Sequence, residues 1–275
     1  MLGLTKTKAQ EAKLVTTEDF ITELFCRVDD AMTDTPKHIQ AELYPSEVAT
    51  LALLFAIKGV GNRAFYRWLE RDFKHLFPRL PERTRLFRLF AAHDEWARRF
   101  LAAPSVLGVI DAYGIELIHP MREGRTPHQI GKKGLSNHRW IVGGKLCLLL
   151  NKLGLVVDWA ADTANVSDTR FQPLIKRYED EMIVCSDTGF HAKTGDPHNL
   201  KVCPRGTWNS RMMVETVLSM LTLVNHFKKV MHRVWRYFEM RLGWTMAAFN
   251  ILTQWHGLEP DEDGIVHLSI AEFSL

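Results

Sequence analysis

Two short apolar runs that each end in an aspartate decide the fold of this chain: Ser105-Val-Leu-Gly-Val-Ile-Asp111 and Glu181-Met-Ile-Val-Cys-Ser-Asp187. Continuous apolar runs of this length are typical of central strands that are covered on both faces. If the two strands are neighbours, their carboxylates emerge together at one edge of the sheet, where open α/β sheets place their sites. The alternative for either aspartate alone is that it caps a turn, because Asp is common where strands end.

The segments around these two runs complete an α/β pattern. Further strands are predicted at 140–150 and 155–160, joined by the hairpin-type turn 151–154, and a brief strand at 200–203. A crossover helix is predicted over 169–178, with Asp168 as its N-cap or as an indirect support of a site. Helices follow from Thr207 through Phe249, so an α/β core with antiparallel and parallel parts is expected.

The first 100 residues have helical periodicity. One apolar segment begins at Pro45 and runs through Ile57, stops at Gly59-Val60-Gly61-Asn62, and is followed by a second segment from Arg63 to Phe73. Arginines at 63, 67 and 71 form a stripe on the second segment. A helix, a glycine turn and a helix with a basic stripe are the layout of a helix-turn-helix, and the alternative is an ordinary αα-hairpin.

Composition places the chain among globular proteins. It has 275 residues, of which 46% are hydrophobic and 24% charged, which excludes a disordered, collagen-like or membrane composition. No apolar stretch is long enough for a secretory signal or a membrane span, so a cytoplasmic protein is expected. The four cysteines form no CxxC pair and the twelve histidines no HExxH motif, which argues against a disulfide framework and a zinc site.

Charge is distributed in clusters. The net charge is only +3, but Lys and Arg are concentrated in 61–99, 119–145 and 226–241. Three basic clusters indicate a polyanionic partner. The alternative is that they are solvated faces, balanced by the acidic tail from Glu259 to Glu272.

A third acidic residue lies on the helix predicted after Arg205. Its buried stripe is formed by Val214, Val217, Leu218, Leu221 and Val224, while Trp208, Arg211, Glu215 and Thr222 fall within about 60° of one another on one flank. An Arg–Glu pair at i, i+4 on a helix surface is the simpler explanation for two of these residues.

These residues belong to a longer pattern. The chain resembles the DDE-type insertion-sequence transposases, whose third carboxylate lies in a Tyr-x2-Arg-x3-Glu-x6-Lys signature. Trp208, Arg211 and Glu215 fit this spacing, and Thr222 stands where the family has lysine. Matching stretches also occur at 109–113, 132–140, 144–151, 164–168 and 186–190. The resemblance covers at least residues 105–250.

The resemblance implies a fold and a reaction. It implies an RNase H-like mixed sheet flanked by helices over 104–275, preceded by an all-helical DNA-binding region over 1–103. The reaction is hydrolysis at transposon ends, followed by attack of the freed 3′-hydroxyls on target DNA. The partners implied are double-stranded DNA, as terminal inverted repeats and as target, and a second copy in a homodimer. No membrane partner is expected, and the setting is a bacterial-type cytosol with its nucleoid.

Roles for the residues follow from these expectations. Asp111, Asp187 and Glu215 are expected to hold two Mg²⁺ or Mn²⁺ ions, since carboxylate oxygens are hard ligands, and Arg211 to hold a phosphate or orient Glu215. The residues expected at DNA are Arg63, Arg67, Arg71, Arg122, Arg125, Lys132, Lys133, Arg139, Lys228, Lys229, Arg233 and Arg236. Arg122 to Arg139 are expected in a glycine-containing loop, and 226–241 in an amphipathic helix. The competing functions are a catalytically decayed DNA-binding protein and an RNase H-like nuclease that does not transpose.

Overall fold

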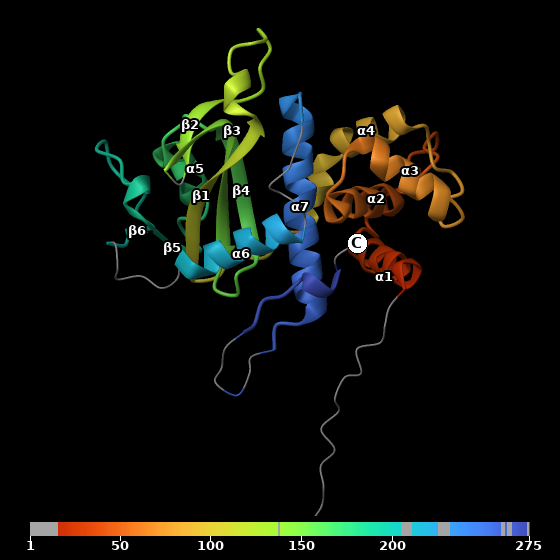
Figure 1. Cartoon of the computed structure of the whole chain (residues 1–275). Coiled ribbons are helices and arrows are strands. Elements are labelled where there is room, and N and C mark those ends of the chain that lie inside the picture. Colours follow the sequence, from red (N-terminus) through yellow and green to blue (C-terminus); the bar gives the residue numbers. More distant parts are fainter. Residues whose placement is uncertain are drawn as a thin grey trace, which may run out of the picture.

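The computed structural model describes residues 16–136, 138–204, 211–224, 232–259, 262, 266–273 and 275. It has a mixed α/β architecture in which a long helix, α7, stands between a sheet and a group of helices (Figure 1). Predictions were also made for Trp208, Lys228, Lys229 and the side chain of Arg211, which lie outside the described part of the chain.

From Thr17 to Phe100 the regular secondary structure is helical. They are α1 (Thr17–Ala31), α2 (Pro45–Lys58), α3 (Asn62–Asp72), α4 (Arg83–Ala92) and the 3-10 helix η1 (Asp94–Phe100). Thr16 and Asp19 form a capping box at the start of α1, and Pro45 occupies the first turn of α2. Gly59 ends α2 with a φ of 65°, which suits glycine. The two helices predicted on either side of this glycine turn are therefore present as α2 and α3.

The sheet has six strands: β1 (Leu107–Ile118), β2 (Lys132–Ser136), β3 (Arg139–Asn151), β4 (Val156–Thr163), β5 (Ile183–Ser186) and β6 (Leu200–Val202). β3 pairs antiparallel with β1 along one side, and with β2 and then β4 along the other. β5 pairs parallel with β1, and β6 pairs parallel with β5. The predicted combination of antiparallel and parallel strands is confirmed.

Three boundaries differ from the prediction. β1 does not end at Asp111 but continues to Ile118, because β3 is long enough to pair with it along its whole length. Lys132 and Lys133 lie in β2 rather than in a loop, since 132–136 forms a hairpin with the start of β3. The crossover is shorter than predicted, with η3 (Asp168–Phe171) and α5 (Gln172–Lys176).

Helices cover both faces of the sheet. One apolar cluster joins Ile110, Leu149 and Val184 to the η3–α5 segment on one face. On the other face, β1, β3 and β4 share a cluster with α6 (Arg211–Leu223), α7 (Trp235–His256) and the N-terminal helices. The predicted division at residues 103 and 104 falls between η1 and β1, and this second cluster runs across it.

Of the helix predicted over 226–241, the part up to residue 231 lies outside the described residues. Residues 232–234 are not helical, Val234 is extended, and α7 begins at Trp235. No single described helix is long and apolar enough to cross a membrane. α2 and α3 pass that test only as a pair, which is bent by 117°.

Candidate active site

The two aspartates predicted to meet lie on neighbouring strands. β1 and β5 are parallel, and the register pairs Val109 with Cys185. Asp111 and Asp187 each follow two residues later, so they lie at the same level of the sheet. Val109 packs in the cluster that contains α6 and α7, and the alternation of side chains places Asp111 on that same face. The proposed juxtaposition of two carboxylate-bearing strands is therefore present.

Local hydrogen bonds fix both carboxylates. Asp111 Oδ1 accepts from the backbone N–H of Ala112 at 2.7 Å. Asp187 Oδ1 accepts from Gly189 N–H at 2.9 Å, as the N-cap of the short 3-10 helix η4 (Thr188–Phe190). Asp187 follows β5 directly and caps the next turn, so its structural role coexists with its place beside β1.

A third aspartate, Asp168, lies close to Asp187. Asp168 is not the N-cap of η3, because that position is held by Ser167. Its carboxylate instead accepts a hydrogen bond from Lys145 Nζ at 2.9 Å, and the same ammonium donates to Val166 O at 2.7 Å. A Cβ atom added at Gly189 would lie 2.8 Å from Asp168 Oδ2 and 3.0 Å from Asp187 Oδ1. These two carboxylate oxygens are thus less than about 6 Å apart.

The pKa of Cys147, a buried thiol on β3, is affected by burial and by nearby charges. Burial raises its pKa well above the usual value, and the negative charges of Asp168 and Asp111 raise it further. Cys147 belongs to the apolar cluster on the η3–α5 face, whereas Asp111 lies on the opposite face, toward α6 and α7. The structure therefore brings Asp168 close to Asp187, and it does not show Asp111 in the same group of described side chains.

Glu215 lies on α6, which packs against β1. Val214, Val217 and Leu221 form the buried side of this helix, as predicted, and Glu215 is exposed beside them. It lines a hollow of about 480 Å³ between α6 and residues 268–271. In the described part of the chain, no group of three or more His, Cys, Asp or Glu is close enough to hold a metal ion. Convergence of all three predicted acids thus stays a prediction.

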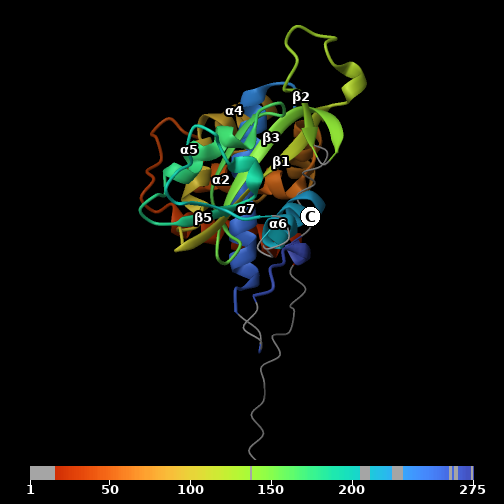
Figure 2. The same cartoon turned by 90° about the vertical axis from the view of Figure 1, so that its left-hand side faces the viewer.

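The predicted DNA-contacting residues divide into several groups. Arg63, Arg67 and Arg71 are exposed along α3, with Arg71 paired to Asp72. Arg122 and Arg125 lie on the segment between β1 and β2 that projects from one end of the sheet in both views (Figures 1 and 2).

Several of the other residues predicted to contact DNA form ion pairs within the chain. Lys133 is 3.1 Å from Glu123, and Arg139 is 3.7 Å from Glu116. Arg236 pairs with Asp94 and donates to Ala91 O, which fastens α7 to the end of α4. Lys132 and Arg233 are exposed.

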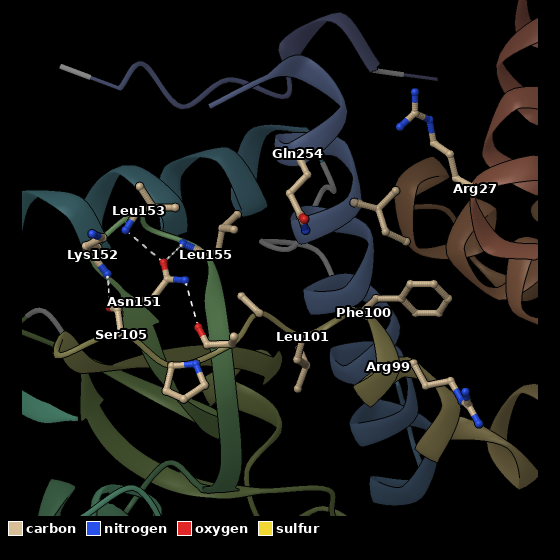
Figure 3. Close-up of a pocket in the computed structure, with 14 residues that line it drawn as sticks. Arg27, Arg99, Phe100, Leu101, Ser105, Asn151, Lys152, Leu153, Leu155 and Gln254 are labelled. Atoms are coloured by element: carbon tan, nitrogen blue, oxygen red, sulfur yellow. Dashed lines mark hydrogen bonds between the residues drawn. The ribbon is translucent and has the colours of Figure 1, made fainter. Parts of the chain in front are cut away.

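The largest pocket described is remote from these residues. It has a volume of about 560 Å³ and lies between the β3–β4 turn, the segment 99–105 and α7 (Figure 3). Its central polar group, Asn151, is fully used: the side chain donates to Ala103 O and accepts from the N–H groups of Leu153 and Leu155. Arg27 and Arg99 at its rim are paired with Glu23 and Asp34. None of the predicted site residues lines it.

Asp168 was predicted as an N-cap or as an indirect support of the site; the N-cap prediction is wrong, and its closeness to Asp187 and its bond to Lys145 were not predicted. Lys145 was counted only as part of a basic cluster. The available signal was its place in an otherwise apolar strand, where an unpaired ammonium is costly.

No family model and no curated protein matches this sequence. The interpretation of the site therefore depends on its residues and their geometry.

Proposed function

We propose that the chain is a DDE-type DNA transposase that cleaves transposon ends and joins their 3′-hydroxyls to target DNA. The observation that carries this proposal is the parallel register of β1 and β5, which sets Asp111 and Asp187 level on adjacent strands. The mixed sheet with helices on both faces supports an RNase H-like catalytic part over residues 104–275.

The residues at this site suit divalent metal ions. At Gly189 the carboxylate oxygens of Asp168 and Asp187 approach the backbone so closely that a Cβ would lie 2.8 Å from one and 3.0 Å from the other. Oxygen donors of this type fit Mg²⁺ or Mn²⁺. Asp111 and Asp187 would be the principal ligands, and Glu215 would complete the set from α6. When bound, two such ions activate a water or a 3′-hydroxyl and stabilise the leaving oxygen at phosphorus.

The chain's own groups hold this site in place. Lys145 fixes Asp168 and offsets its charge, so that Asp111 and Asp187 would remain for the metal. The Gly189 N–H orients Asp187, and the backbone of β1 orients Asp111. Arg211, at the first position of α6, would hold a DNA phosphate or orient Glu215 one turn further along the helix.

Two features support DNA as the partner. α2 and α3 meet at 117°, within the range of about 90–120° that is usual for helix-turn-helix pairs, and the arginine stripe of α3 is exposed. The projecting segment between β1 and β2 carries further exposed arginines. An αα-hairpin without a ligand would explain the angle but not the exposed arginine stripe along α3, in which Arg71 is paired with Asp72.

Nicking of a supercoiled plasmid tests the proposal. Wild-type protein with Mg²⁺ or Mn²⁺ is expected to nick the plasmid and to stop when the metal is chelated. Asp111→Asn, Asp187→Asn and Glu215→Gln should each reduce the rate by about 100-fold or more. Glu23→Gln, which removes an exposed carboxylate from α1 away from the site, should leave the rate within about twofold.

The same preparations distinguish the competing functions. DNA binding without metal-dependent nicking would favour a decayed DNA-binding protein. Nicking without transfer of a pre-cleaved 3′-hydroxyl end into target DNA would favour a nuclease. Unchanged nicking by Asp111→Asn would refute the site itself.

A further inference from the structure

A small basic cavity lies where α2, α3 and α7 meet, away from the acidic site. Its volume is about 320 Å³, and it is lined by the turn 59–62 together with His232, Arg233, Val234, Tyr237 and Arg241. Two of these residues are arginines and one is a histidine. No carboxylate is among the described residues that line it.

Arg241 is buried without a charged partner. Its exposed fraction is 4%, yet it lies in the middle of α7. Nη1 donates to Val60 O at 3.2 Å, and the guanidinium lies 4.7 Å from the centre of the Phe55 ring. Nη2 is buried and has no hydrogen-bond partner in the part of the chain that the structure describes. Burial lowers the pKa of Arg241 to about 10, so the group keeps its charge at neutral pH.

Two further polar groups border this cavity. His232 Nε2 is buried and has no hydrogen-bond partner among the described residues. The turn leads directly into α3, an 11-residue helix whose N-cap is Gly61, and glycine has no side chain to accept from the first-turn N–H groups. The positive end of the α3 dipole therefore faces the same space as Arg241.

We propose that this cavity binds a phosphate group. An unpaired buried guanidinium is costly, and an oxyanion that accepts from Nη2 and from the α3 amides would remove that cost. A purely structural role for Arg241, as a cation at the end of α2, accounts for Nη1 but leaves Nη2 unexplained. The inference deepens the proposed function: the phosphate would belong to the DNA backbone and would anchor α3, which carries the exposed arginine stripe. Free phosphate has the same chemistry and is separated by the experiment.

Gly61 offers a test that should not disturb folding. Its φ of −74° is ordinary, and a Cβ added there meets nothing within 4 Å. Gly61→Asp places a carboxylate at the N-cap, where it caps α3 and competes with a bound phosphate. Gly61→Ala adds the Cβ alone and is the matched control. Arg241→Met removes the buried charge and provides a second, independent variant.

Thermal unfolding in inorganic phosphate is compared with unfolding in chloride at equal ionic strength. Phosphate is expected to raise the Tm of wild type and Gly61→Ala by several degrees. It should leave the Tm of Gly61→Asp and of Arg241→Met unchanged. Equal Tm values in the two salts for the wild type, or equal phosphate effects for Gly61→Asp and Gly61→Ala, would overturn the proposed site.

Duplex DNA then identifies the source of the phosphate. Gly61→Asp should bind duplex about tenfold more weakly than Gly61→Ala, because a like charge faces the backbone. Lys152→Gln, an exposed residue on the β3–β4 turn, controls for the lost net charge and should have a much smaller effect. Equal DNA affinities with an intact phosphate effect would assign the site to free phosphate and overturn the DNA assignment. A wild-type protein that nicks plasmid with metal but has the same Tm in phosphate and in chloride would overturn this inference alone.

Discussion

At the scale of single residues, Asp158 shows what sequence patterns cannot reveal. It is 1% exposed within β4, and it accepts from Arg98 at 3.1 Å and from Arg177. Tyr178 and the Trp159 amide complete its set of donors. In the sequence it interrupts the apolar run Val156-Val-Asp-Trp-Ala, and its arginine partners lie 60 and 19 positions away. Asp111 and Asp187 could be predicted because each follows an apolar run directly.

Asp158→Asn should destabilise the fold. The substitution leaves two arginines without their common carboxylate. We expect a loss of about 2 kcal/mol in the free energy of unfolding, less than for a fully buried pair because both arginine side chains are more than half exposed. Urea denaturation measures it. Glu23→Gln, which breaks an exposed i, i+4 pair with Arg27, should cost about 0.5 kcal/mol or less. Equal losses in the two variants would contradict this account of Asp158.

His232 should make stability depend on pH. Burial, and the charge of Arg241, lower its pKa in the folded chain to about 4, whereas the unfolded value is near 6.5. The unfolded chain therefore binds the proton first as pH falls. The contribution of His232 is complete above about pH 6.5 and is lost as the pH falls to 4, amounting to at most about 3 kcal/mol.

His232→Gln removes this titration. Denaturation in chloride buffers between pH 7 and pH 4 should show a shallower decline for His232→Gln than for wild type. Identical slopes for the two proteins would show that His232 is not held neutral by burial.

At the scale of elements, the side chain of Asn250 joins helix α7 to the sheet by hydrogen bonds, in addition to their shared apolar cluster. Asn250 is fully buried and accepts from Val156 N–H at 2.8 Å, while its Nδ2 donates to Val156 O and to Phe100 O. These bonds satisfy the backbone at the start of β4 and join it to the end of η1. The sequence predicted the strands and helices through their periodicity. It could not predict this contact, because it depends on which residue of α7 faces β4.

Asn250→Ala should therefore weaken the attachment of α7. It removes the buried partner of the Val156 N–H and of the Phe100 carbonyl, while Val156 O keeps its bond from the Ala102 N–H, and we expect a loss of about 3 kcal/mol in the free energy of unfolding. Gln254→Ala, one turn further along, loses only a part-buried bond to the carbonyl of Asn250 and should cost about 1 kcal/mol or less. A smaller loss for Asn250→Ala than for Gln254→Ala would contradict this role.

At the scale of the whole molecule, one apolar cluster joins the N-terminal helices, α6, α7 and one face of the sheet. The carboxylates of Asp111 and Asp187 lie on neighbouring strands beside this cluster, and Asp168 approaches from the crossover segment. Sequence patterns identified Asp111 and Asp187 because each follows an apolar run directly. They gave Asp168 only as an N-cap or as an indirect support of the site, since its approach to Gly189 depends on how the crossover folds.

Asp111 and Asp187 are proposed to share a divalent cation. Calorimetric titration of the folded protein with Mn²⁺ measures this in wild type, Asp111→Asn, Asp187→Asn and the control Glu23→Gln, which changes an exposed carboxylate on α1. We expect binding by wild type and Glu23→Gln, and a loss of about tenfold or more in affinity for each of the other two variants. An Mn²⁺ affinity that is the same in all four proteins would contradict a cation shared by these two aspartates.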